Sequence, residues 1–220
     1  MRHWLMYLWF LVIVRPIARL LIGVSVHGRE HLRFSEPTIF VANHNSHLDA
    51  AVLMDLMRLR DLPRVRPVAA ADYFEQGPIR NFVWKRCMNV LAIRRDKVTR
   101  SCNPLASMIE ALDAGATLIL FPEGTRGDPE KLGEFKTGIA HVLAKRPRTP
   151  VVPVYMRNLG FAMPRGDLII VPMFCDVFIG PPRIIEGARP QIMQHITDAF
   201  HNLVVQADAM RPADVPADDR

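Results

Sequence analysis

The chain has 220 residues, half of them hydrophobic, and carries 28 Lys and Arg against 22 Asp and Glu, for a formal net charge of +6. This length suits one domain with a substantial core, and a basic, apolar chain suits an anionic membrane or a phosphorylated substrate. Nucleic acid is not expected as a partner, because the sequence has no zinc-finger spacing, no RNP-like aromatic motif and no long Lys/Arg block.

The three cysteines, Cys87, Cys102 and Cys175, are too few and too irregularly spaced for a disulfide scaffold or a zinc site. We therefore expect reduced thiols, no bound metal and an active site that faces the cytoplasm. The sequence contains neither a Gly-x-x-x-x-Gly-Lys loop nor a Gly-x-Gly-x-x-Gly motif, so it predicts no nucleotide cofactor.

The N-terminal segment is the most apolar part of the chain. Residues 4–14, "WLMYLWFLVIV", precede Arg15 and a second apolar stretch. Eleven helical residues rise only about 16 Å, half of a hydrocarbon core, and the aromatic residues favour the membrane interface. Arg15 and Arg19 share a helix face from which they can meet lipid phosphates. We predict that residues 1–27 form a membrane-associated helical segment. The alternative is a helix packed on the domain's own core.

After Gly28, short strand patterns alternate with helical ones. The expected strands are 38–42, 65–71, 90–94, 117–121, 151–156 and 177–179. The expected helices are 46–60, 78–88, 101–113, 136–144 and 191–209. Most of these strands are apolar on both faces, which is typical of a sheet covered by helices. The alternation predicts an α/β domain over residues 28–205, followed by a disordered tail over residues 206–220.

Polar residues gather at the corner after the first of these strands, in "NHNSHLD" at residues 43–49. Ser46 and Asp49 fit a helix capping box, but capping does not account for His44. Five residues across such a corner bring the His44 imidazole to the Asp49 carboxylate, whereas His47 lies on the other side of the helix. A His–carboxylate pair makes a general base. Because the chain has no Gly-x-Ser-x-Gly nucleophile elbow, we expect this base to activate a substrate hydroxyl.

A second polar turn follows a buried strand in "LILFPEGTRG", residues 118–127. Gly124 permits backbone conformations that other residues avoid. Arg95, Arg126 and Lys136 offer the charged donors that a phosphoester needs. The alternative is an ordinary solvated turn. Like His44, the turn follows the C-terminal end of an expected strand, where open α/β sheets bind ligands.

Together these motifs resemble the glycerolipid acyltransferases of the 1-acyl-glycerol-3-phosphate acyltransferase type. "NHNSHLD" is similar to the first family block, "NVLAIRR" (residues 89–95) to the second, "FPEGTR" (121–126) to the third and "VVPV" (151–154) to the fourth. "FKTG" after the third block is also similar. The resemblance covers residues 28–185 and implies a mixed central sheet flanked by helices.

The resemblance implies an enzyme that transfers a fatty acyl chain from acyl-CoA or acyl carrier protein to a lysophospholipid hydroxyl. It implies His44 as general base, Asp49 as its partner, and docking of the N-terminal helices on a phospholipid membrane. The acyl donor is a co-substrate, and no separate cofactor is implied. We expect substrate contacts from Arg95, Glu123, Gly124, Thr125, Arg126 and Lys136, and a role of Pro153 on the acyl-donor side.

Two positions depart from the family pattern. Asn89 stands where the second block usually has Gly, and Arg94 precedes Arg95 where other residues are usual. The doubled arginine leaves the acceptor head group open between 1-acyl-glycerol-3-phosphate, a lysolipid with a larger head group and an acylated amino-acid lipid.

Two other functions remain as alternatives. A thioesterase or lipid hydrolase would use the same dyad, whereas a non-catalytic lipid-binding protein gives no reason to pair His44 with Asp49.

Overall fold

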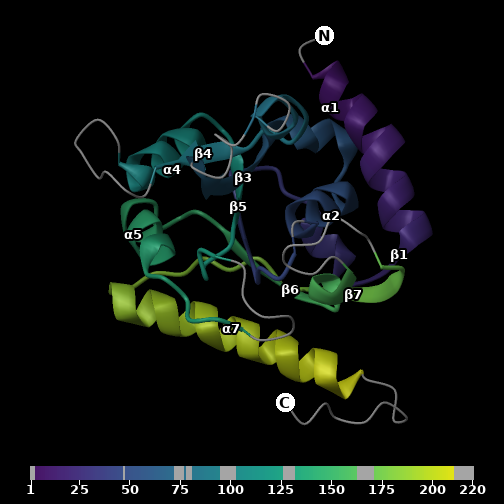
Figure 1. Ribbon diagram of the computed structural model, residues 1–220. Helices are drawn as coiled ribbons and strands as arrows, with labels where there is room; N and C mark the ends of the chain where they lie inside the picture. Colours follow the sequence, from purple (N-terminus) through teal and green to yellow (C-terminus); the bar gives the residue numbers. More distant parts are fainter. Residues whose placement is uncertain are drawn as a thin grey trace.

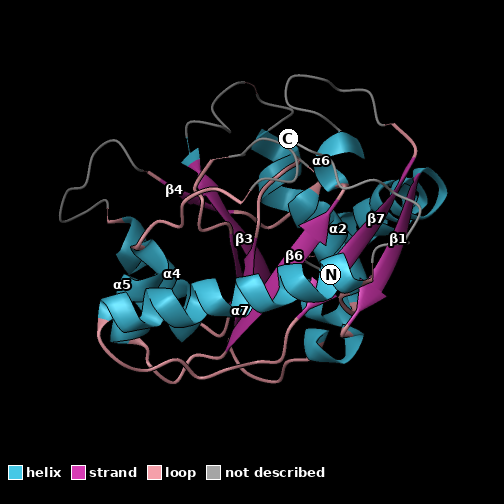
Figure 2. Ribbon diagram, turned by 90° about the horizontal axis from the view of Figure 1, so that it is seen from below, coloured by secondary structure: helices cyan, strands magenta, loops and turns pink. Residues whose placement is uncertain are grey.

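The computed structural model describes residues 3–46, 48–71, 77, 81–94, 103–125, 132–162 and 171–210. Seven strands form one sheet in the order β1-β7-β6-β2-β5-β3-β4 (Figures 1 and 2). They are β1 (Ile22–His27), β2 (Ile39–Ala42), β3 (Val65–Ala70), β4 (Leu91–Ile93), β5 (Thr117–Leu120), β6 (Val151–Arg157) and β7 (Met173–Ile179). Only the β6–β7 pair is antiparallel, so the expected α/β fold with a mixed sheet is confirmed.

Helices cover both faces of this sheet. They are α1 (Trp4–Trp9), η1 (Phe10–Val14), η2 (Ile17–Leu21), η3 (Arg29–Leu32), α2 (Asp49–Leu56), η4 (Leu59–Arg64), η6 (Val83–Cys87), α4 (Pro104–Asp113), α5 (Gly138–Lys145), α6 (Leu159–Ala162) and α7 (Arg189–Ala209). Figure 1 shows α1 in purple at the right and α7 in yellow along the bottom of the molecule. The expected helices 136–144 and 191–209 are present as α5 and α7, and 101–113 is present as α4 from Pro104 on. The expected helix 46–60 is shorter, as α2, and 78–88 is described only from residue 81, with η6 at Val83–Cys87.

Alternation along β2 divides the interior into two cores. Phe40 and Ala42 pack with the N-terminal helix and α2, whereas Ile39 and Val41 pack with α4, α5 and α7. All four side chains are fully buried. Successive residues of a strand point to opposite faces, so a strand in the middle of a covered sheet must be apolar throughout. This burial fixes the place of the polar corner that follows β2.

The N-terminal helical segment packs one face on the domain and exposes the other. Met6, Phe10, Val14 and Ala18 recur at every fourth position and are buried. The opposite surface exposes large apolar side chains: Trp4, Leu8, Leu11, Val12, Ile13, Leu20 and Leu21. Within the described part of the chain, residues 4–21 form the one helix long and apolar enough to cross a membrane by length and composition.

An ion pair also ties this helix to the domain. Arg15 donates from Nε to Oδ1 of Asp55 on α2 at 3.0 Å, and the Asp55 side chain is only 7% exposed. The helical segment therefore has a polar attachment in addition to its apolar face.

Two boundaries differ from those expected. The stretch 22–27, which the sequence analysis placed in the N-terminal helical segment, is strand β1 and pairs in parallel with β7. Strand β7 is correspondingly longer than the stretch 177–179 that was expected. At the other end, α7 continues to Ala209, so residues 206–209 are helical instead of belonging to the tail, and residues 211–220 lie outside the described part.

Candidate active site

The corner between β2 and α2 brings His44 and Asp49 into contact. Nδ1 of His44 lies 2.9 Å from Oδ2 of Asp49. The same Oδ2 accepts the backbone N–H groups of Asn45 at 2.7 Å and of Ser46 at 2.8 Å. Asp49 is the first residue of α2 and is completely buried. Its carboxylate thus holds the loop before the helix and orients the imidazole, as the five-residue spacing predicts.

Among the described residues, the imidazole of His44 has one hydrogen-bond partner, Asp49 at Nδ1. A carboxylate only accepts hydrogen bonds, so an ionised Asp49 assigns the proton to Nδ1 and leaves the lone pair on Nε2. The ring stacks on Phe121, with centroids 4.2 Å apart and planes 24° from parallel. The side chain remains 23% exposed. This arrangement suits a general base that takes a proton at Nε2. His47, which the sequence analysis judged the poorer partner, lies outside the described residues.

Glu123 approaches the same histidine from the neighbouring strand. It follows β5, and its Oε1 accepts the backbone N–H of His44 at 3.0 Å. The residue is only 5% exposed. Burial raises the pKa of Glu123 above its usual value, and the hydrogen bond from the His44 backbone opposes that rise. Glu123 was expected to contact substrate, and its contact with the base was not expected from the sequence.

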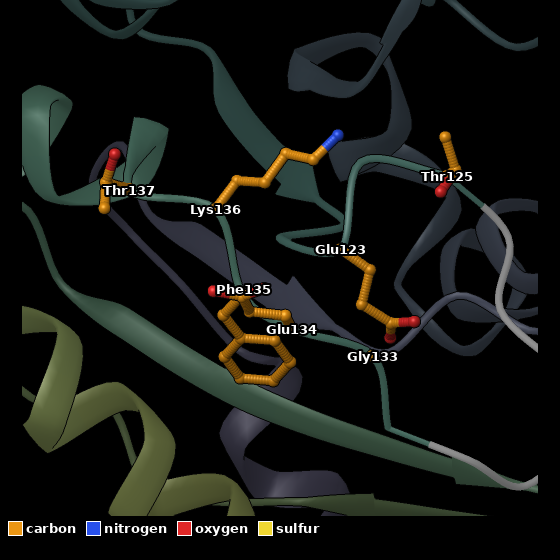
Figure 3. Close-up of a pocket in the computed structure, with 7 residues that line it drawn as sticks. All are labelled: Glu123, Thr125, Gly133, Glu134, Phe135, Lys136 and Thr137. Atoms are coloured by element: carbon orange, nitrogen blue, oxygen red, sulfur yellow. The ribbon is translucent and has the colours of Figure 1, made fainter.

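An open pocket with a volume of ≈ 650 Å³ lies beside this corner (Figure 3). It is lined by Glu123, Thr125, Gly133, Glu134, Phe135, Lys136 and Thr137. Figure 3 shows the Lys136 side chain extending towards the turn that carries Glu123 and Thr125. Gly124 in this turn has φ +74°, and a Cβ there would lie 2.8 Å from Nζ of Lys136. The positive φ therefore favours glycine here, whereas the flexible end of Lys136 could move aside for a Cβ.

The remaining predicted residues are Arg95, Arg126 and Pro153. Arg95 and Arg126 are outside the described residues, whereas Arg94 follows directly after β4. Pro153 is buried in the middle of β6, opposite Val41 in the sheet and against Gly180. It does not line the pocket beside Glu123. Within the described part of the chain, no three His, Cys, Asp or Glu side chains cluster as metal ligands would.

Sequence reasoning missed Asn43, which directly precedes His44. Its side chain is buried and bonds both backbone groups of Met156 on β6: Nδ2 donates to the carbonyl at 2.8 Å and Oδ1 accepts from the N–H at 2.7 Å. An asparagine immediately after a buried apolar strand was the available signal, because its amide matches a peptide group in donor and acceptor.

Comparison with known proteins gives a family match and several relatives. A family model described as "Acyltransferase" matches residues 23–157, more than half of the chain. A chloroplastic 1-acyl-sn-glycerol-3-phosphate acyltransferase of Arabidopsis thaliana is 29% identical over 166 residues, which is 75% of this chain and 43% of that protein. The 1-acyl-sn-glycerol-3-phosphate acyltransferase alpha of Mus musculus is 26% identical over 183 residues, 82% of this chain and 62% of that protein. The chain thus spans about half the length of these curated relatives.

A solved structure shares the fold. The crystal structure of the 1-acyl-sn-glycerophosphate acyltransferase PlsC from Thermotoga maritima superposes with a TM-score of 0.72 and 23% sequence identity. The match covers 90% of this chain and 77% of that chain. At this identity the likeness shows the architecture: an α/β domain with a flanked sheet.

Proposed function

Because the chain belongs to the Acyltransferase family, we propose that it transfers a fatty acyl chain from acyl-CoA or acyl carrier protein to the free hydroxyl of a lysophospholipid. The observation that carries this proposal is the 2.9 Å contact between His44 Nδ1 and the buried Asp49 carboxylate. The relatives' names, 1-acyl-sn-glycerol-3-phosphate acyltransferases, make 1-acyl-glycerol-3-phosphate the first acceptor to test.

In the proposed reaction, Nε2 of His44 takes the proton of the acceptor hydroxyl as its oxygen attacks the thioester carbonyl. A carbon–oxygen bond forms and the carbon–sulfur bond breaks. The imidazolium then returns the proton to the departing thiolate, so the histidine ends as it began. Asp49 holds the ring and stabilises the imidazolium while the charge exists. General-base assistance of this kind typically contributes about 10²–10⁴ in rate.

We propose that the pocket beside Glu123 receives the acceptor's phosphate. Lys136 supplies the positive charge there, and Thr125 lines the same pocket with a hydroxyl. Gly124 keeps the turn low enough for the lysine to cross it. Arg95 and Arg126 remain proposed phosphate contacts from the family resemblance, because Arg forms bidentate bonds with phosphate oxygens. Pro153 is buried in β6, so its proposed effect on the donor acts through packing of the sheet.

We propose further that the protein works on a membrane surface, with its active site on the cytoplasmic side. The exposed apolar side chains between Trp4 and Leu21 supply the surface that enters the lipid. The buried face of the same helix and the Arg15–Asp55 pair keep it on the domain. The geometry thus supports a helix that lies on the bilayer and also packs on the domain's own core.

One panel of acyl donors and lipid acceptors identifies both substrates of the protein. The full-length protein in detergent micelles receives a labelled fatty acyl chain, attached either to CoA or to acyl carrier protein. Each donor is tested with 1-acyl-glycerol-3-phosphate, with lysolipids that have larger head groups and with an acylated amino-acid lipid. We expect label in the diacyl product of 1-acyl-glycerol-3-phosphate. Label released only as free fatty acid, in every combination, would identify a thioesterase or lipid hydrolase instead.

A further inference from the structure

The backbone at the start of the β2–α2 corner is held from both sides. Strand β2 lies between β5 and β6, and it runs parallel to both. The ladder with β6 ends at the pair Ala42–Val154, and the ladder with β5 ends at Val41–Leu120. The next two residues, Asn43 and His44, leave the sheet and must be fixed by other means.

Asn43 continues the sheet with its side chain. Its amide makes two bonds of 2.7 and 2.8 Å to the N–H and the carbonyl of Met156, and the residue is 1% exposed. A side-chain amide has the same donor and acceptor as a peptide group. The Asn43 amide therefore bonds the N–H and the carbonyl of Met156 on β6, beyond the last backbone pair between β2 and β6. The main chain at Asn43 can then turn towards α2.

On the β5 side of β2, the side chain of Glu123 likewise provides a hydrogen-bond partner where the backbone pairing has ended. Residues 39–41 pair with residues 118–120, and the same offset of 79 places His44 opposite Glu123. The strand backbone has ended there, and the carboxylate Oε1 accepts the His44 N–H at 3.0 Å. Phe121, two residues before Glu123, lies flat on the imidazole. One short segment after β5 thus fixes both the backbone and the ring plane of His44.

Resting on the function proposed above, we infer that Asn43 and Glu123 are positioning residues for His44, because each fixes the backbone at the start of the corner through its side chain. Glu123 also lines the pocket proposed for the acceptor's phosphate. One of its oxygens is already bonded to the His44 backbone. A shift of about 1 Å in a catalytic group can cost on the order of 100-fold in rate.

The test separates kcat from KM in four variants of the full-length protein, using acyl-CoA and 1-acyl-glycerol-3-phosphate in detergent micelles. Glu123→Ala and Asn43→Ala remove the two contacts and should lower kcat by about 100-fold. The KM values of acceptor and donor should stay within about 3-fold, because the two lost contacts act on the backbone around His44. Glu123→Gln keeps an oxygen for the His44 N–H and should restore most of kcat. Asn43→Asp loses the donor to the Met156 carbonyl and should remain slow.

Asn103→Ala is the matched control, since Asn103 makes a similar bond, to the backbone N–H of Leu105 at 3.0 Å, at the start of α4. It should lower the melting temperature and leave kcat unchanged. If the alanine variants do not fold, the kcat values of Glu123→Gln and Asn43→Asp test the positioning role. A rise of tenfold or more in acceptor KM in either Glu123 variant would overturn the positioning role, as would full kcat in Asn43→Asp. Absence of transfer by the unmodified protein would instead overturn the proposed function.

Discussion

The imidazole of His44 meets the carboxylate of Asp49 at 2.9 Å, and the carboxylate is completely buried while the histidine side chain is 23% exposed. The buried Asp49 carboxylate orients Nδ1 of the His44 ring. Because the ring is partly exposed, its Nε2 can reach a substrate. We predict that His44→Ala lowers kcat by about 10²–10⁴. His47→Ala should keep most of the activity. The reverse pattern in a steady-state assay would remove His44 from the mechanism.

Asp49→Asn tests the partner of the base. The substitution keeps an oxygen for the two backbone N–H groups but removes the negative charge that stabilises an imidazolium. We predict a kcat loss on the order of 100-fold. The free energy of unfolding should fall by about 1–3 kcal/mol, since the charged acceptor is lost. Assay and chemical denaturation on the same preparation separate the two effects. Activity within twofold of the unmodified protein would contradict the proposed pairing.

The buried carboxylate of Glu123 should make stability depend on pH. Burial raises its pKa in the folded protein above the unfolded value of about 4.3. The folded state therefore holds its proton more tightly than the unfolded chain does. Its contribution to stability is present below pH 4.3 and is lost as the pH rises through the folded pKa. The glutamine in Glu123→Gln cannot ionise, so this variant should not lose stability at that position over the same pH range.

The measurement is the melting temperature of both proteins between about pH 4 and 8, in the same detergent. The melting temperature of Glu123→Gln minus that of the unmodified protein should increase with pH and then level off. Glu110→Gln, on α4, serves as a control for the general effect of removing a carboxylate. A difference that decreases with pH would mean that the ionised form of Glu123 is the favoured one in the fold.

Lys136 should govern affinity for the acceptor. We predict that Lys136→Gln raises the acceptor KM by about 10- to 100-fold, since a charge-assisted bond to phosphate contributes about 1.5–3 kcal/mol, and leaves the donor KM unchanged. Lys145→Gln, at the exposed end of α5, removes the same charge away from the pocket and should change neither constant. Equal increases in both KM values for Lys136→Gln would argue against a phosphate contact.

The exposed apolar face of the N-terminal helix should hold the protein on lipid. Leu11→Gln combined with Val12→Gln removes apolar surface from that face without changing the charge, and we predict loss of sedimentation with anionic vesicles without loss of folding. Val205 is similarly exposed, but on α7, so Val205→Gln should sediment as the unmodified protein does. Retained vesicle binding by the double variant would place the membrane contact elsewhere.

Much of the fold followed from local patterns, because the inner strands are apolar throughout and the helices keep their period. Strand β1 was missed because Ile22, Val24 and Val26 continue an apolar helix without a break in composition. Its alternation of apolar with small residues was the only local signal. Its pairing with β7 joins residues some 150 positions apart, and a contact of that range leaves no periodic trace in either segment.

The site shows the same division. The His44–Asp49 pair lies within one corner, so spacing alone predicted it. The contacts of Asn43 with Met156 and of Glu123 with His44 join residues 113 and 79 positions apart. They depend on which strands are neighbours in the sheet, and the sequence does not state that order. For this reason the contact of Glu123 with His44 was not predicted, and Asn43 was not singled out.

The most direct test of the central claim follows the label from acyl-CoA into lipid with the unmodified protein and with His44→Ala, each with 1-acyl-glycerol-3-phosphate present. Products are separated into diacyl phospholipid and free fatty acid. We predict that the unmodified protein places the label in diacyl phospholipid and that His44→Ala forms at least about 100-fold less of it. Label that appears only as free fatty acid, or diacyl product formed equally well by His44→Ala, would contradict transfer by a His44 base.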